Sequence, residues 1–296
     1  MEDQGKKLTF FQKTPIQCPL CETVFYREEL LTGGGRMIAG PLTRDLRRNY
    51  EPSKKFGEVY PLVYPITVCP ACFFATFPQD FLSPPEKNKA ILLEQSEKRK
   101  ESIHLLFPEL DFTRPRGLQE GTASYILALF CYDYFTKEFS PTIKQGVCCL
   151  RAAWCSNDLH RKFPNENYDY LAANLYRKAR FFYTQAVEKE QQGLEPLSGM
   201  KVLGPDLDKD YGYDGVLYIN GLLELLYGPQ QDKEKRIQAL TTAKRYIAKI
   251  FGMGKASKQK PSALLDQARD LYEEINKALE QIGVQVAPEE EVEGNE

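Results

Sequence analysis

Apolar residues follow two different patterns along the chain, and the pattern changes near residue 83. Before that point they occur in short β-branched and aromatic runs, such as Thr23-Val-Phe-Tyr, which proline and glycine interrupt. Runs of this kind are typical of short strands. After that point apolar residues recur every three or four positions, as at Ile143, Val147 and Leu150. This spacing predicts helices that pack through one face.

The second part of the chain predicts a series of helices joined by short loops. A serine followed by proline marks helix starts at Ser83-Pro84 and Ser140-Pro141, because proline suits the first turn and serine can cap it. The polar run Glu94 to Ser102 is expected to be a solvated part of its helix. The predicted helices cover residues 84–106, 118–137, 141–160, 167–192, 214–227, 232–251 and 262–282.

Composition and charge narrow the functional classes. The 296 residues include 39 Lys and Arg against 41 Asp and Glu, which gives a net charge of −2. This balance excludes a broadly basic nucleic-acid coat and a polybasic membrane binder. The longest apolar run, Tyr125 to Tyr132, is far shorter than a membrane helix, and Met1 to Lys13 has no apolar stretch of signal-peptide length. We therefore expect a cytoplasmic protein that is not inserted into a membrane.

Four of the eight cysteines form two matching motifs, Cys18-Pro-Leu-Cys21 and Cys69-Pro-Ala-Cys72. Two residues between cysteines allow both sulfurs to face one ion, and two such motifs complete a tetrahedral shell with bonds of about 2.3 Å. The sequence therefore predicts that Cys18, Cys21, Cys69 and Cys72 bind a metal. Each motif lies between two predicted strands, which is the two-hairpin layout of a zinc ribbon. These strands cover residues 14–17, 23–26, 66–68 and 73–76.

One structural zinc ion is the expected cofactor. Four thiolates leave no coordination position for water or substrate, which disfavours catalysis by the metal. Iron also accepts four thiolates, so a rubredoxin-like electron carrier is the alternative, and disulfides or free thiols are a further one. Glycine often follows the second cysteine of such motifs, whereas Glu22 and Phe73 occupy those positions here.

The remaining thiols and both histidines indicate no catalytic site. His104 and His160 are the only histidines, and neither belongs to a recognisable nucleophile motif. We therefore expect a protein that is not an enzyme. Because they fall inside predicted helices, four cysteines are expected to be core residues: Cys131, Cys148, Cys149 and Cys155.

Basic residues gather between the two cysteine motifs, and Tyr50 and Phe56 lie close to them in the sequence. A basic loop with aromatic neighbours could bind nucleic acid, which is a second alternative function. Residues 1–85 nevertheless hold 10 Lys and Arg against 9 Asp and Glu, so no basic field covers this part. A contact with a protein partner is therefore the preferred interpretation of the basic cluster: Arg36, Arg44, Arg47 and Arg48.

The order of these motifs resembles an uncharacterised bacterial family, domain of unknown function 2225 (DUF2225). The resemblance extends to about residue 250 and implies a metal ribbon followed by helical repeats, with no established activity. The matching segments are Phe10-Phe11, Cys18–Cys21, Arg36, Asp45-Leu46, Tyr60–Tyr64, Cys69–Ala75, Leu150–Trp154 and Leu217–Gly221.

Together the patterns predict an α+β chain with three parts. Residues 1–83 form a small β zinc-ribbon-like domain, residues 84–283 form a mainly α domain of helical hairpins similar to tetratricopeptide repeats, and residues 284–296 form an acidic disordered tail. Stacked helical hairpins present concave surfaces that hold a helix or an extended peptide. The predicted function is therefore that of a zinc-binding adapter for a protein partner.

Overall fold

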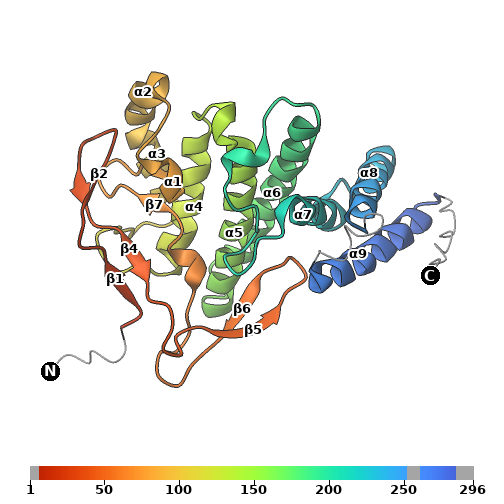
Figure 1. The fold of residues 1–296 in the computed structure, drawn as a ribbon, viewed down its shortest axis with the longest axis horizontal. Helices are drawn as coiled ribbons and strands as arrows, with labels where there is room; N and C mark the ends of the chain where they lie inside the picture. The colour runs from red at the N-terminus through yellow and green to blue at the C-terminus, as the bar shows by residue number, and fades with distance from the viewer. Residues whose placement is uncertain (1–6, 252–260, 285–296) are drawn as a thin grey trace. The chain divides into compact units, whose positions relative to one another are not determined.

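The computed structural model describes residues 7–251 and 261–284, and Figure 1 shows how their helices and strands are arranged. The chain divides into two compact units, Met1–Gly212 and Tyr213–Glu296. The domain boundary predicted at residue 83 falls inside the first unit and stays a prediction. From residue 285 onward, the predicted acidic tail lies outside the described residues.

The first unit begins with antiparallel pairs of short strands. Their partners are β1 (Thr9–Phe11) with β4 (Glu28–Leu30), β2 (Ile16–Gln17) with β3 (Val24–Phe25), β5 (Ile38–Leu42) with β6 (Arg48–Glu51), and β7 (Thr67–Val68) with β8 (Ala75–Thr76). The β2–β3 and β7–β8 hairpins confirm the strands predicted on both sides of each cysteine motif. In these hairpins Gln17 lies opposite Val24 and Val68 lies opposite Ala75.

Helices make up the rest of the first unit. They are α1 (Pro78–Phe81), α2 (Lys89–Glu94), α3 (Ser96–His104), α4 (Leu118–Tyr132), α5 (Pro141–Lys162) and α6 (Tyr168–Gln191), with short 3-10 turns η1 (Pro61–Val63), η2 (Glu86–Asn88), η3 (Lys137–Phe139) and η4 (Leu197–Gly199). Helices α4, α5 and α6 lie side by side, and β8 packs against α4 (Figure 1). Nearly all of α4 is buried, because its apolar residues surround the helix.

One predicted helix start and one predicted helix cap differ from the structure. Ser83 does not begin a helix, since the first turn after it is η2, and the helix expected over 84–106 is divided at Gln95 into α2 and α3. Pro141 does open α5, but the Ser140 hydroxyl donates a hydrogen bond to the Pro196 carbonyl instead of capping the helix.

A residue far along the chain caps α5 in place of Ser140. The Glu195 carboxylate accepts hydrogen bonds from the Thr142 backbone N–H and from its hydroxyl, both at 2.8 Å. A carboxylate at a helix N-terminus also interacts favourably with the helix dipole. The loop after α6 therefore supplies the cap that the local sequence predicted for Ser140.

Among its described residues, the second unit contains α7 (Gly212–Tyr227, which begins at the boundary), α8 (Lys233–Phe251) and α9 (Ser262–Gln281). Gly221 lets α7 approach its neighbour closely, because a Cβ at this position would lie 2.8 Å from Ile247 of α8. Consecutive helices thus pack together in this unit as well, while a tetratricopeptide repeat stays a prediction. No helix among residues 7–251 and 261–284 is long and apolar enough to cross a bilayer.

A buried ion pair and a hydrogen bond join α1 to α5 and α4. Lys144 of α5 is 0% exposed, and its Nζ lies 2.6 Å from the Asp80 carboxylate. The Tyr132 hydroxyl of α4 also donates to Asp80 at 2.6 Å. Burial lowers the pKa of Lys144, while the hydrogen bond to Asp80 opposes that shift. Removing one member of such a pair leaves an uncompensated charge in the core.

We predict that Asp80→Asn lowers the free energy of unfolding of the first unit by about 3–5 kcal/mol. The double variant Asp80→Asn/Lys144→Met should recover a large part of this loss, because no buried charge then remains. Trp154, the only tryptophan, is buried in the first unit, so its fluorescence during urea unfolding reports that unit. If the double variant loses as much free energy of unfolding as Asp80→Asn and Lys144→Met lose together, Asp80 and Lys144 are not coupled.

Candidate metal centre

The two cysteine motifs lie together in space although 47 residues (22–68) separate them. The sulfur atoms of the four cysteines all lie within 4.8 Å of one another. The Sγ atoms of Cys18 and Cys72 are 3.7 Å apart, and those of Cys21 and Cys69 are 3.5 Å apart. Cys21 is partly exposed, whereas the other three are buried. Each close contact thus joins a cysteine of one hairpin to a cysteine of the other.

Each cysteine motif forms the turn of its hairpin with the same backbone hydrogen bonds. In the first motif the N–H of Cys18 donates to the carbonyl of Thr23 at 2.9 Å, and the N–H of Glu22 donates to the carbonyl of Cys18 at 3.0 Å. The second motif repeats both bonds at the corresponding positions, also at 2.9 and 3.0 Å. The repeated Cys-Pro-x-Cys sequence therefore folds into two equivalent turns that face one another.

The residue after each motif adopts a left-handed backbone conformation. Glu22 has φ 61° and Phe73 has φ 54°. The sequence pattern predicted that glycine would suit these positions, and the backbone has the corresponding conformation even though neither residue is glycine. Phe73 has a further role, because its ring packs edge-on against Phe112 with centroids 5.3 Å apart and also contacts His104.

The arrangement of the sulfurs fits a tetrahedral metal ion. Metal–sulfur bonds of about 2.3 Å in a tetrahedral shell place the sulfurs about 3.8 Å apart. The two closest pairs, at 3.5 and 3.7 Å, are near this value. All four thiols are free, so no disulfide joins them. The four cysteines could therefore hold one metal ion without a large movement of either hairpin.

Crowding of the thiols shifts their acidity in opposite directions. Contacts with the side chains of Cys69 and Cys72 lower the pKa of Cys18 to about 2. The contact with Cys18 raises the pKa of Cys69 to about 12 and also raises that of Cys72, and burial adds to both shifts. Without a cation, the neighbouring thiols therefore stabilise one thiolate and oppose others. A bound divalent cation removes this conflict, because it stabilises every thiolate that it contacts.

Neighbouring side chains hold the cysteine turns in place. The Thr23 hydroxyl lies 3.2 Å from the sulfur of Cys21. Arg99 of α3 donates to the Cys72 carbonyl at 3.0 Å and to the Leu92 carbonyl at 2.6 Å. Arg99 is buried, so the prediction that residues 94–102 are solvated is wrong at this position. Hydrophobic periodicity could not predict the burial of Arg99, because an arginine counts as polar in the pattern whether it is exposed or buried.

The second hairpin is attached to the helical core. The backbone N–H of Ala75 donates to the sulfur of Cys131 in α4 at 3.4 Å, and the N–H of Phe77 donates to the Tyr132 hydroxyl at 3.0 Å. From the first hairpin, Phe25 packs edge-on against Phe81 of α1, with ring centroids 5.7 Å apart. A metal ion on the four sulfurs would therefore link the first hairpin to a part of the chain that the helices already hold.

Comparison with known proteins identifies the family. A family model described as "uncharacterized protein conserved in bacteria (DUF2225)" matches residues 11–275. The chain belongs to this family. It is also 45% identical to an uncharacterized protein of Borreliella burgdorferi over 277 residues, which cover 94% of this chain and 99% of that protein. No solved structure matches the chain. The resemblance predicted from the motif order is thus confirmed.

Two of the four arginines predicted to contact a partner take part in internal ion pairs in this DUF2225 chain. Arg47 forms a two-pronged ion pair with the buried carboxylate of Asp158 and also donates to the Trp154 carbonyl at 3.3 Å. Arg48 lies 2.9 Å from the Asp208 carboxylate. Both side chains therefore connect the β5–β6 hairpin to other parts of the first unit.

The other two arginines lie nearer the surface. Arg36 stacks on the Phe56 ring at 4.7 Å from its centroid and donates to the Lys7 and Gly33 carbonyls. Arg44 is exposed. A role for all four arginines in partner binding stays a prediction, and Arg44, which is exposed, is the best placed of them.

The remaining cysteines and histidines are not part of the sulfur cluster. His104 packs against Phe73 through its ring, and His160 lies 4.0 Å from Asp169. In the part of the chain that the structure describes, the sulfur cluster is the one group of histidine, cysteine or acidic side chains arranged to hold a metal. As predicted, four cysteines in the helices are buried: Cys131, Cys148, Cys149 and Cys155.

We predict that Glu22→Gly and Phe73→Gly have opposite effects on the stability of the first unit. Glycine at position 22 relieves a left-handed conformation, so the free energy of unfolding should rise by up to about 1 kcal/mol. At position 73 the same relief is outweighed by loss of a buried aromatic ring, and stability should fall by about 2 kcal/mol or more. Urea unfolding followed by Trp154 fluorescence measures both changes. Equal changes in the free energy of unfolding of the two variants would contradict a stabilising role for the Phe73 ring.

Proposed function

We propose that this DUF2225 protein is a zinc-binding adapter whose metal has a structural role. The observation that carries the proposal is the arrangement of the four sulfurs, which lie within 4.8 Å of one another on two facing hairpin turns, with two pairs near the tetrahedral spacing. Four thiolates saturate a tetrahedral ion, so no position is left for water or substrate. We therefore also propose that the metal centre does not catalyse a reaction.

The short strands explain why the fold would need the metal. Strands β2 and β3 contain two residues each, and an isolated two-stranded hairpin is at best marginally stable in water. Binding one ion to both turns restricts the first hairpin, in the same way that small zinc modules fold upon their metal. Because the second hairpin is held against α4, the ion would attach the first hairpin to the helical core.

We propose zinc rather than iron, because a structural site needs no change of oxidation state. Both metals accept four thiolates, but only iron changes its oxidation state in such a shell. Eight free thiols are consistent with a reducing compartment, and we propose a cytoplasmic location. If the bound metal is iron, a rubredoxin-like electron carrier replaces the adapter as the proposed function.

The helical part supplies one proposed binding surface, and the segment around the β5–β6 hairpin, which carries Arg36 and Arg44, supplies a second. Layers of consecutive helices commonly hold a helix or an extended peptide from a partner. Arg44 is exposed and Arg36 lies near the surface, so an acidic segment of a protein partner would complement them. Nucleic acid is disfavoured because Arg47 and Arg48 are already paired with carboxylates.

We predict that the full chain, purified without chelator or added metal, contains about one zinc per molecule and is colourless. Removing the metal with a chelator should lower the midpoint of the Trp154 thermal transition by about 5 °C or more, because the first hairpin loses its link to the core. Elemental analysis, visible absorption and fluorescence melting measure these outcomes.

Matched variants separate the metal ligands from other buried thiols. Cys21→Ser should lose most of the zinc, whereas Cys149→Ala, which changes a buried cysteine in α5, should keep it. One equivalent of iron with thiolate-to-iron colour would support the electron carrier instead. Protein that contains neither metal, with melting unchanged by chelator, would falsify the structural metal site.

We predict that the double reversal Arg36→Glu/Arg44→Glu weakens capture of a protein partner at least several-fold. A charged rim contributes to association through complementary charge, and reversal makes it repulsive. The measurement is affinity capture from an extract of the encoding organism, quantified by mass spectrometry at low and physiological salt. Lys98→Glu in α3 serves as a control for a change of charge elsewhere. Equal capture by all variants would remove these arginines from the proposed surface.

A further inference from the structure

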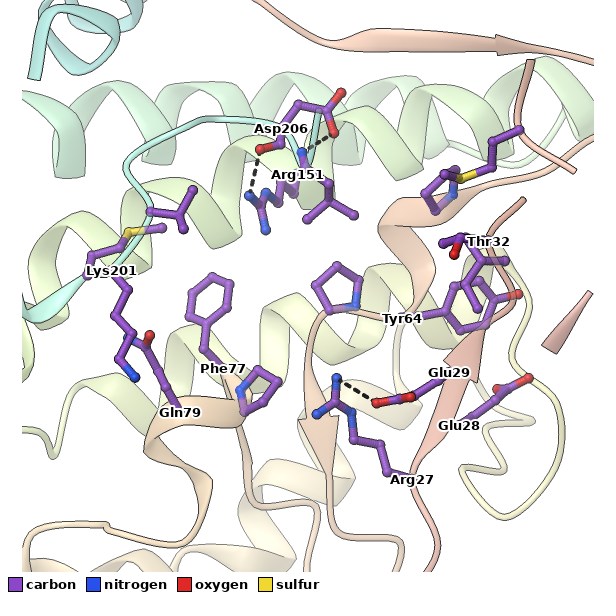
Figure 2. Close-up of a pocket in the computed structure, with 18 of the residues that line it drawn as sticks. Arg27, Glu28, Glu29, Thr32, Tyr64, Phe77, Gln79, Arg151, Lys201 and Asp206 are labelled. Carbon is purple, nitrogen blue, oxygen red and sulfur yellow. Dashed lines mark hydrogen bonds and ion pairs between the residues drawn. The ribbon is translucent and has the colours of Figure 1, made fainter. Parts of the chain in front are cut away.

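A cleft of about 670 Å³ opens in the first unit (Figure 2), and none of the four cysteines of the sulfur cluster lines it. Residues around β4, the segment after η1, the start of α1 and the loop 200–207 form its walls. Ligand-binding pockets in proteins usually measure about 300–1,000 Å³. The cleft therefore has the size of a site for a small organic molecule.

Apolar side chains and rigid residues line most of the cleft. Tyr50, Tyr64 and Phe77 contribute partly exposed rings, and three prolines, each with a fixed φ, also line the cleft. A preformed apolar wall favours binding, because little conformational entropy is lost when the ligand enters. The prolines are Pro61, Pro65 and Pro78.

Two charged residues in the wall already serve the fold. The guanidinium of Arg151 donates to the Pro205 carbonyl at 2.7 Å and to those of Gly204 and Asp206 at 3.3 and 3.4 Å. The Asp206 carboxylate accepts hydrogen bonds from the backbone N–H groups of Arg48 and Leu207, both at 2.6 Å. These bonds hold the loop 200–207 in position, so both groups are already used by the fold.

Arg27 differs, because the protein uses little of its hydrogen-bonding capacity. Its Nε is buried and has no hydrogen-bond partner among the described residues, and its Nη2 lies 3.6 Å from Glu29. The Glu29 oxygen at this distance also accepts a hydrogen bond from Gln12 at 2.6 Å. An arginine carries five N–H donors. The side chain is 23% exposed, and Figure 2 shows its guanidinium directed into the cleft.

The accessible charges in the cleft favour a single negative charge on the ligand. Arg27 and Lys201 are cationic, and Glu29 opposes them. Glu28 lies on the opposite face of the strand from Arg27 and Glu29, where its carboxylate accepts the backbone N–H of Arg116 at 2.8 Å (Figure 2). One anionic group would therefore balance the charges that face the open space.

We infer that this cleft binds an amphipathic organic monoanion, with an apolar body against the tyrosine, phenylalanine and proline wall and one acidic group on Arg27. Such a molecule satisfies the underused donors of Arg27 and covers the exposed rings at the same time. Straight-chain and aromatic carboxylic acids share this chemistry. The site is separate from the metal centre and does not depend on the proposed adapter function.

Two fluorescent dyes that differ by one sulfonate test the inference. The monoanion 8-anilinonaphthalene-1-sulfonate should bind the full chain about tenfold more tightly than neutral N-phenyl-1-naphthylamine, as one charge-assisted interaction allows. Arg27→Met should remove most of this difference by weakening the sulfonate alone. Arg114→Met, at an exposed arginine that does not line the cleft, is the matched control and should change neither affinity.

A second variant locates the site independently of Arg27. Val202 lines the cleft and is half exposed, so Val202→Asp should fold normally and weaken the sulfonate more than the neutral dye. Trp154 fluorescence melting verifies that each variant is folded. Equal affinities for the two dyes in the native protein, an unchanged sulfonate affinity in Arg27→Met, or no binding of either dye overturns the inference.

Competition experiments then show whether the cleft prefers a straight-chain or an aromatic acid. Displacement of the bound sulfonate by octanoate indicates a straight-chain acid, and displacement by 3-phenylpropionate indicates an aromatic acid, so either result supports the inference. Octanamide and 3-phenylpropanamide, which lack the charge, should displace it about tenfold less well. Failure of both acids, or displacement only by a neutral pentaproline peptide, overturns the assignment to a small acid.

Discussion

Four sulfur atoms come together where the two cysteine hairpins face each other, and the proposed role of the amino-terminal part depends on this contact. Strands of two residues bury too little surface to hold a hairpin in place, and the first hairpin adds a ring contact to α1. Equivalent backbone turns direct both cysteine pairs inward, at the cost of left-handed conformations at Glu22 and Phe73. Under the proposed metal-binding role, these conformations are the cost of placing the four sulfurs within 4.8 Å of one another.

Buried charged side chains form a second framework in the same unit. Arg99 bonds to the carbonyl of Cys72, Arg151 holds the loop 200–207, and Arg47 connects the β5–β6 hairpin to Asp158 of α5. Each joins segments far apart in sequence, where few regular backbone hydrogen bonds are available. A guanidinium suits this task, because its several donors can satisfy more than one acceptor at once. Arg27 is more exposed than these residues and has unused donors beside a cleft.

Local pattern predicted much of the secondary structure and the composition of the metal centre. Helices α4 to α9 begin or end close to their predicted limits, and both cysteine hairpins lie where strands were expected. Prediction was weaker where a distant residue replaced a local one. Glu195 caps α5 instead of Ser140, and Arg99 is buried within a segment that reads as solvated. In both cases a tertiary contact outweighed a preference that the neighbouring residues express.

By itself the sequence determined the periodic helices, the paired Cys-Pro-x-Cys turns and the family, because these depend on residue types at short, regular spacing. Only the tertiary structure decided that the two turns face each other, that Arg47 pairs with Asp158, and that a cleft lies beside Arg27. Those features join segments separated by many residues. Their geometry follows from how the whole unit packs, and no local pattern of residues encodes it.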